Sequence, residues 1–297
     1  MSKAAKKRKR LEALEAYVFL IPTLLGMVFL TIGAIIGAIL LSFTDYSLKW
    51  PPSFIGLANF RDLFSDRLLP LVLSNTFWYL VMAVVPCVIF ALFLSLLVNG
   101  KTRRTRVFRT IYFWPVVGSM TAIALVWRFL LNDTFGFVNY LIGMFGVQGP
   151  RWFASTTWAL VGIAIIFVWK NVGYYMTILL SGLQNIPQDL NEAAIIDGAG
   201  LVRRTWYITL PLISPTMFFV IIMTSIASFQ VFDSIMVIND RGGPANATTT
   251  LSFFIYQNAF SFMRMGYAAA AGVLLFFIVS IFSMVQFRLQ NKWVFYG

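Results

Sequence analysis

The chain has 297 residues, of which 59% are hydrophobic and 17% aromatic, while only 11% are charged. Soluble domains carry about 25% charged residues, so this composition excludes a soluble fold and predicts a polytopic membrane protein. There is no histidine and one cysteine, Cys87, in an apolar stretch that favours a small buried hydrophobe. These counts exclude an internal disulfide, a His or Cys metal site and histidine-based catalysis.

The net charge of +12 comes largely from two basic clusters, one within residues 3–10 and one within 101–109. Both adjoin apolar segments, which is typical of membrane flanks and argues against a nucleic-acid partner. The apolar segment 16–43 is longer than the roughly 7–15 residues of a signal-peptide core. We therefore predict an uncleaved first span.

A helix crosses the bilayer in about 20 apolar residues. Six segments meet this requirement: 16–43, 72–98, 110–131, 156–181, 213–238 and 266–288. With a cytoplasmic N-terminus most Lys and Arg outside the spans lie on the inner side, so the positive-inside rule places both termini in the cytoplasm. We expect an all-α protein with a basic cytoplasmic N-terminus, 1–15, and a six-helix transmembrane domain, 16–297.

The segment between the fourth and fifth spans, residues 182–212, is polar and cytoplasmic by the same count. Pro187 can open a helix through Glu192, and Gly198 with Gly200 can end it. A second short helical piece is expected to run to Pro211. This helix-turn-helix predicts a docking element and not a bilayer span.

The spacing of this loop resembles the EAA loop of bacterial ABC-importer permeases, through which a membrane subunit meets its ATPase. The residues that carry the likeness, and the expected ATPase-coupling set, are Glu192, Ala193, Ala194, Asp197, Gly198 and Pro211. Other short words resemble the carbohydrate-uptake branch of that family, in its first-permease type. They are Gly56–Phe60, Tyr112–Val116, Gly242–Pro244 with Thr248–Thr250, and Gly266–Ala269.

The resemblance implies a multi-pass permease of the bacterial inner membrane that carries a sugar or sugar-like solute by alternating access. It implies a second permease subunit, two copies of an ATPase subunit and an extracytoplasmic solute-binding protein. The surfaces Lys49–Pro70 and Gly242–Thr250 are expected to be exposed loops that receive that protein. ATP and Mg would bind the ATPase, because the chain has no phosphate-binding GxxxxGK[ST] sequence and no cofactor of its own.

Charged side chains within the spans are costly in lipid, so Arg128, Lys170 and Asp233 should face protein or water. By depth, Asp233 is better matched with Arg128 than with Lys170. Polar and aromatic side chains on the fourth and fifth spans have the chemistry to line one sugar pathway. These candidates are Trp169, Asn171, Tyr174, Tyr175, Gln230 and Asp233. The same residue types also serve as interhelical contacts or interfacial anchors.

One other function stays open at this point. In an ion-coupled secondary transporter of a small polar solute, Asp233, Lys170 or Arg128 would couple to the ion. The docking loop and the absence of an evident internal repeat argue against it. An intramembrane enzyme is not expected, because the spans hold no convincing nucleophile–base pair.

Overall fold

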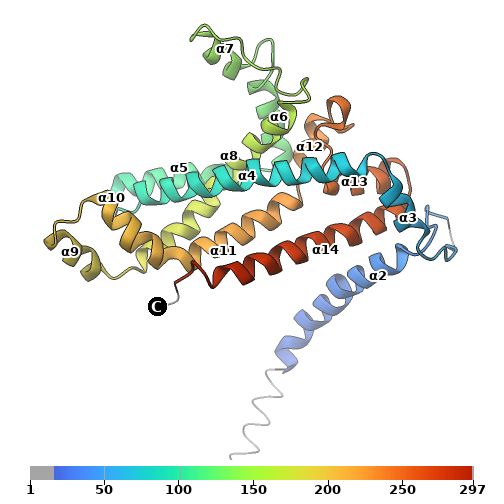
Figure 1. Cartoon of the computed structure of the whole chain (residues 1–297), viewed down its shortest axis with the longest axis horizontal. Coiled ribbons are helices and arrows are strands. Elements are labelled where there is room, and N and C mark those ends of the chain that lie inside the picture. The colour runs from blue at the N-terminus through green and yellow to red at the C-terminus, as the bar shows by residue number, and fades with distance from the viewer. Residues whose placement is uncertain (1–16, 50, 101, 296–297) are drawn as a thin grey trace, which may run out of the picture. The chain divides into compact units, whose positions relative to one another are not determined.

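A computed structural model describes residues 17–49, 51–100 and 102–295 (Figure 1). The predicted basic N-terminus, 1–15, lies outside this part of the chain. The described residues are helical apart from turns and one isolated antiparallel bridge between Thr44 and Phe54, so the all-α prediction is confirmed. The chain divides into two compact units, one running to Ser65 with Asn258–Leu274 and the other formed by Asp66–Gln257 with Leu275–Gly297.

Five helices in the described residues are long and apolar enough to cross a membrane. They are Tyr17–Leu41, which contains the π-helix η1 (Met27–Ile32) and α2 (Gly33–Leu41); α4 (Leu69–Leu97); α8 (Ala159–Gln184); Leu201–Phe229, which ends in α11 (Leu210–Phe229); and α14 (Met265–Gln290). Each satisfies its own backbone hydrogen bonds, which lipid requires. They correspond to the first, second, fourth, fifth and sixth predicted spans.

The third predicted span, 110–131, is a broken helix, and the described residues hold up to six spans if its two halves are taken as one crossing. It is split into α5 (Arg103–Val117) and α6 (Met120–Leu130), whose axes differ by 102°. Gly118 and Ser119 between them are extended, with ψ of 146° and 136°. Pro115, in the last turn of α5, has no N–H to continue the helix ladder. In Figure 1, α6 and α7 (Phe137–Gly143) leave the side of the bundle formed by α4, α8 and α11.

The fifth predicted span, 213–238, also ends early. The helix stops at Phe229, and a separate short helix, α12 (Asp233–Ile238), follows a non-helical link. The broken segments lie together, because α6 packs against both α12 and α8. Each pair of helices was predicted as one span because both of its halves are apolar.

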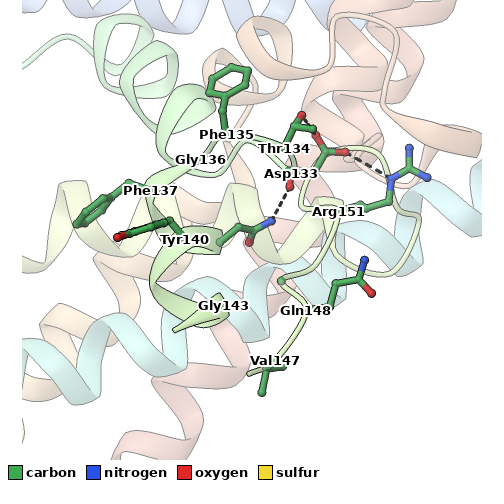
Figure 2. A pocket seen from close by; sticks show the side chains of 12 residues that line it. Asp133, Thr134, Phe135, Gly136, Phe137, Tyr140, Gly143, Val147, Gln148 and Arg151 are labelled. Atoms are coloured by element: carbon green, nitrogen blue, oxygen red, sulfur yellow. Dashed lines mark hydrogen bonds and ion pairs between the residues drawn. The ribbon is translucent and has the colours of Figure 1, made fainter. Parts of the chain in front are cut away.

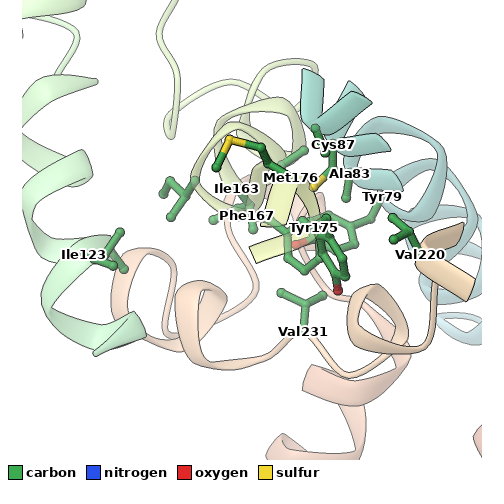
Figure 3. Close-up of a cluster of buried hydrophobic side chains, with 14 of the residues drawn as sticks. Tyr79, Ala83, Cys87, Ile123, Ile163, Phe167, Tyr175, Met176, Val220 and Val231 are labelled. Atoms are coloured by element: carbon green, nitrogen blue, oxygen red, sulfur yellow. The ribbon is translucent and has the colours of Figure 1, made fainter. Parts of the chain in front are cut away.

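The core of the second unit lies between α4, α8 and α11 (Figure 3). Tyr79, Cys87 and Met176 are fully buried there, which confirms Cys87 as a buried hydrophobe. Between helices in lipid, close packing replaces the hydrophobic effect as the driving force, so small residues at contacts matter. Gly173 of α8 illustrates this, because a Cβ at that position would collide with the backbone carbonyl of Tyr112 in α5.

The segment Gly242–Thr250 is not the exposed loop that was expected. Thr248, Thr249 and Thr250 are at most 1% exposed. The Asn75 side chain of α4 donates to the carbonyls of Asn246 (2.9 Å) and Thr249 (3.1 Å). The glycines at 242 and 243 adopt positive φ, 84° and 75°, which a tight turn requires. This segment, with the 3-10 helix η3 (Pro244–Asn246), locks α12 and α13 (Leu251–Tyr256) onto α4.

In the first unit, two of the short sequence motifs, Gly56–Phe60 and Gly266–Ala269, also hold backbone segments together. Asn59 of α3 (Ala58–Ser65) donates to the carbonyls of Ser42 (2.9 Å) and Thr44 (2.8 Å), and so holds the end of the first span. The Gly266 amide donates to the Tyr46 carbonyl at 2.9 Å. A side chain at 266 would collide with the Thr44 carbonyl, so glycine is required there. The π-helix η4 (Gln257–Ser261) precedes α14 in the chain.

Candidate functional site

The predicted docking element begins with α9, Gln188–Ile196. Pro187 stands immediately before the helix, where its missing N–H costs nothing. Gly198 follows the end of the helix with φ of 75°, and its amide donates to the Ile195 carbonyl at 3.0 Å. The expected helix and its glycine stop are therefore confirmed as local structure.

The second helical piece does not end at Pro211, as the sequence suggested. It starts after Gly200 as α10 (Leu201–Arg204), continues through the π-helix η2 (Thr205–Thr209) and enters α11 without a turn. Pro211 lies inside this continuous helix, directly after the π-helical turn in which the Leu210 amide donates to the Thr205 carbonyl. The 29-residue helix Leu201–Phe229 thus connects the docking element directly to the interior of the bundle.

The docking element exposes apolar side chains beside its charged ones. Glu192, Ala193, Asp197 and Gly198 are exposed, but Ala194 is buried within the chain, so only one of the two alanines can meet a partner. We define the coupling surface as Glu192, Ala193, Ile195, Ile196, Leu201 and Val202. Ile196 is 85% exposed and Leu201 75%. Exposed apolar side chains of this kind are typical of a surface that contacts another protein or a membrane.

A cavity of about 250 Å³ lies between α8, the start of α6 and the link from α11 to α12. It brings together three of the predicted pathway residues, Asn171, Gln230 and Asp233, and adds Lys170. These side chains are positioned in different ways. The Asn171 side chain is held by its hydrogen bond to the Phe167 carbonyl at 2.8 Å, and Gln230 and Asp233 flank the helix break. The break therefore places these polar side chains at one cavity.

The other three pathway candidates lie elsewhere. Trp169 packs edge-on against Trp127, with ring centroids 5.7 Å apart, at an apolar cavity of about 430 Å³. Tyr175 is 3% exposed and lies in the hydrophobic core (Figure 3). Tyr174 is 40% exposed, and its ring contacts that of Tyr175. Trp169 is two residues from Asn171 and points to another side of α8. Tyr175 lies on the same stripe as Asn171 but one turn further along the helix, where that stripe is covered by the hydrophobic core.

Lys170 holds the broken third span. Its Nζ donates to the carbonyls of Val116 (3.1 Å) and Gly118 (2.9 Å) at the end of α5. Terminal carbonyls have no intrahelical partner and carry partial negative charge, so a cation is favourable there. The expected match between Asp233 and Arg128 is wrong in the described part of the chain, because the Arg128 guanidinium donates instead to the Val237 carbonyl at 3.4 Å.

Substitution of Lys170 by methionine is expected to destabilise the α5–α6 break, because two carbonyls lose their donor while the apolar stem is kept. We expect a lower melting temperature and at least a tenfold loss of ATP-driven uptake. Lys170→Arg, which keeps the charge and donors, should recover part of both. Thermal unfolding of the purified complex and uptake into proteoliposomes measure the two effects. A methionine variant with unchanged melting temperature would contradict this role.

Sequence reasoning missed Ser234 and Met120, which also line the cavity. The Ser234 hydroxyl is buried and has no hydrogen-bond partner within the described residues. A single serine in an apolar run carries no signal of this kind, and Met120 reaches the cavity only because the chain breaks just before it. Both depend on tertiary structure.

A second polar site lies in the hairpin after α6 (Figure 2), with a volume of about 630 Å³. Asn139 organises it by donating to the carbonyls of Asp133 (3.2 Å) and Pro150 (3.1 Å), and it accepts from Trp152 Nε1 at 2.7 Å. The ion pair between Arg151 and Asp133 spans 3.4 Å and is solvent-exposed, so it contributes little to stability. These bonds account for the shape of the hairpin.

Comparison with known proteins gives a consistent result. The family described as binding-protein-dependent transport system inner membrane component matches residues 75–296. The chain is 34% identical to the probable ABC transporter permease protein YesP of Bacillus subtilis, over 100% of this chain and 96% of that protein. It is 30% identical to the arabinooligosaccharides transport system permease protein AraP of Halalkalibacterium halodurans, over 94% and 91% of the two chains.

The fold also matches a solved structure. A bacterial alginate ABC transporter, crystallised in complex with an alginate pentasaccharide-bound periplasmic protein, contains a chain that aligns with a TM-score of 0.83. The sequences are 22% identical, and the alignment covers 98% of each chain. An ion-coupled secondary transporter is not supported by these matches. The chain belongs to the binding-protein-dependent ABC transporter permeases of the inner membrane, in their carbohydrate-uptake branch, and is a permease subunit that imports sugar-like solutes.

Proposed function

We propose that the coupling surface docks onto a separate ATPase and that the helix Leu201–Phe229 carries the resulting movement to the cavity. The observation that supports this most strongly is the continuity of that helix, which has one end beside the docking element and the other at Gln230. A helix transmits displacement along its length, whereas a flexible loop would absorb it. The exposed Glu192 carboxylate would meet a basic group of the ATPase in a charge-assisted contact.

The proposed assembly contains this chain, a second and dissimilar permease, two ATPase subunits that bind ATP and Mg, and an extracytoplasmic solute-binding protein. The alginate transporter is described in complex with a periplasmic protein, which supports the last of these. Both termini of this chain would lie in the cytoplasm, on the side of the docking element. The AraP relative is named for arabinooligosaccharides and the solved transporter for alginate, so a carbohydrate is the proposed solute class.

In the proposed cycle, ATP closes the ATPase pair, the docking helices of the two permeases approach each other and the cavity opens outward. Solute then passes from the binding protein to Asn171, Gln230 and Asp233. Hydrolysis returns the cavity to the inner side. This is alternating access, in which the ligand favours one of two conformations and ATP shifts their populations.

An Ile196→Asp variant tests the docking step, because a charge in the middle of an apolar contact has to be desolvated without a partner. We expect the ATPase to be lost when the complex is purified through a tag on this chain, with uptake reduced at least tenfold. Phe145→Asp is the matched control, since Phe145 is 86% exposed and Ile196 is 85% exposed. Retention of the ATPase by Ile196→Asp, or its loss from both variants, would contradict the proposed surface.

A further inference from the structure

We propose that the cavity between α8 and the α11–α12 break selects neutral polyhydroxyl solutes, that is, uncharged sugars, over acidic sugars and sugar phosphates. This rests on the proposed function, because it takes the cavity to be the solute pathway. The inference comes from the charges and hydrogen-bonding groups at the cavity wall.

Among the described residues that line the cavity, the one cation, Lys170, is already engaged. Lys170 has three N–H donors, and two of them are used by the carbonyls of Val116 and Gly118 at 3.1 and 2.9 Å. Those carbonyls lie at the end of α5, where they carry partial negative charge that offsets the ammonium. An anionic solute would have to compete with this structural contact to gain an ion pair.

The one carboxylate among the described residues that line the cavity has no ion-pair partner within them. Asp233 lines the cavity and is exposed to it, and no Lys or Arg within the described residues pairs with it. Arg128, in the last turn of α6, donates instead to the Val237 carbonyl. A phosphate or carboxylate entering the cavity would therefore approach a negative charge that no ion pair neutralises, and like charges repel.

The remaining polar groups suit hydroxyl groups. The Ser234 hydroxyl is buried and lacks a partner within the described residues, which leaves it able to hydrogen-bond a solute hydroxyl at the cavity. Asn171 uses its amide N–H on the Phe167 carbonyl, which leaves its side-chain oxygen as an acceptor. Gln230 adds a further amide. A carboxylate accepts two or more hydroxyl donors in charge-assisted bonds, so Asp233 would be the strongest contact for a neutral sugar.

Uptake of defined probes by the complete complex in proteoliposomes, with its binding protein and ATP, tests the proposal. The neutral probes are arabinotriose and maltotriose, and the acidic probes are an alginate trisaccharide and sn-glycerol 3-phosphate. We expect the wild type to accumulate a neutral probe at least tenfold faster than either acidic one. Asp233→Asn should reduce neutral uptake at least tenfold without reducing acidic uptake, because it removes both the strong acceptor and the repulsion.

Asp240→Asn is the matched control, since Asp240 is an exposed aspartate shortly after α12 and does not line the cavity. An unchanged melting temperature of each variant shows that folding is preserved. Faster ATP-driven uptake of an acidic probe by the wild type, or full neutral uptake by Asp233→Asn, would overturn the selectivity and leave the importer function intact. Uptake driven by an ion gradient in place of ATP would instead contradict the proposed function itself.

Discussion

Replacement of Gly198 by proline is expected to abolish ATP-driven uptake while leaving the membrane spans inserted. Gly198 has φ of 75°, whereas proline is restricted to about −65°, so the chain cannot make the same turn after α9. The proline also removes the amide that donates to the Ile195 carbonyl at 3.0 Å. The part of the coupling surface on α9 would be displaced from the part on α10, while the spans keep their packing. Uptake and ATP hydrolysis, measured on the same proteoliposomes, should become uncoupled.

Gly200→Ala is the control for this variant. Gly200 has φ of −67°, which any residue adopts, and no atom within 4 Å would contact an added Cβ. We expect uptake within about twofold of the wild type, since such a substitution introduces no strain. Normal coupling in the Gly198→Pro complex would show that this turn has no part in energy transfer.

Replacement of Gly173 by alanine should have the second large effect, on stability and uptake together. The added Cβ would overlap the Tyr112 carbonyl of α5, and a backbone atom cannot move aside as a flexible side chain can. Overpacking of a tight contact costs about 1–3 kcal/mol. Because the collision pushes α5 away from α8, it should also lengthen the contacts of Lys170 with Val116 and Gly118. Unfolding of the purified complex in SDS and uptake in proteoliposomes measure both consequences.

Gly272→Ala provides the comparison, because Gly272 lies within α14 and an added Cβ meets nothing within 4 Å. Alanine is also the better helix former, so this variant should be at least as stable as the wild type. Equal stability of the Gly173 and Gly272 variants would mean that α5 relaxes freely, and would contradict a tight α5–α8 contact.

Residue type and spacing predicted the surroundings of the polar residues in the spans only in part. Lys170 was expected to face protein or water from its cost in lipid alone, and it does, but its partners are backbone carbonyls that carry no sequence signal. Asp233 was matched by depth with Arg128, on the assumption of two straight spans. Both spans are broken, so equal depth along ideal helices did not correspond to proximity. Tyr175 had suitable chemistry for a sugar, yet its position on α8 directs it into the core.

The short sequence motifs that suggested a family each make a different structural contact. Gly242 and Gly243 supply the turn that lets Asn75 hold the buried threonines, and Gly266 allows the backbone of Thr44 to approach. Their resemblance to relatives identified the family without revealing these contacts. A short sequence motif indicates where backbone geometry is constrained, but the contacts that impose the constraint come from residues far away in the chain.

Composition and the lengths of the apolar segments were sufficient to establish an all-helical, multi-pass membrane protein and five of its long helices, because each helix satisfies its own backbone within one continuous segment. The glycine that ends α9 was also predictable, since a left-handed turn depends on local sterics. The breaks in the third and fifth spans, the continuity of the docking element with α11 and the residues that share the cavity were decided only by the tertiary structure. These features depend on contacts between distant segments, such as Lys170 with Gly118 and α6 with α12, and no local pattern of residues specifies them.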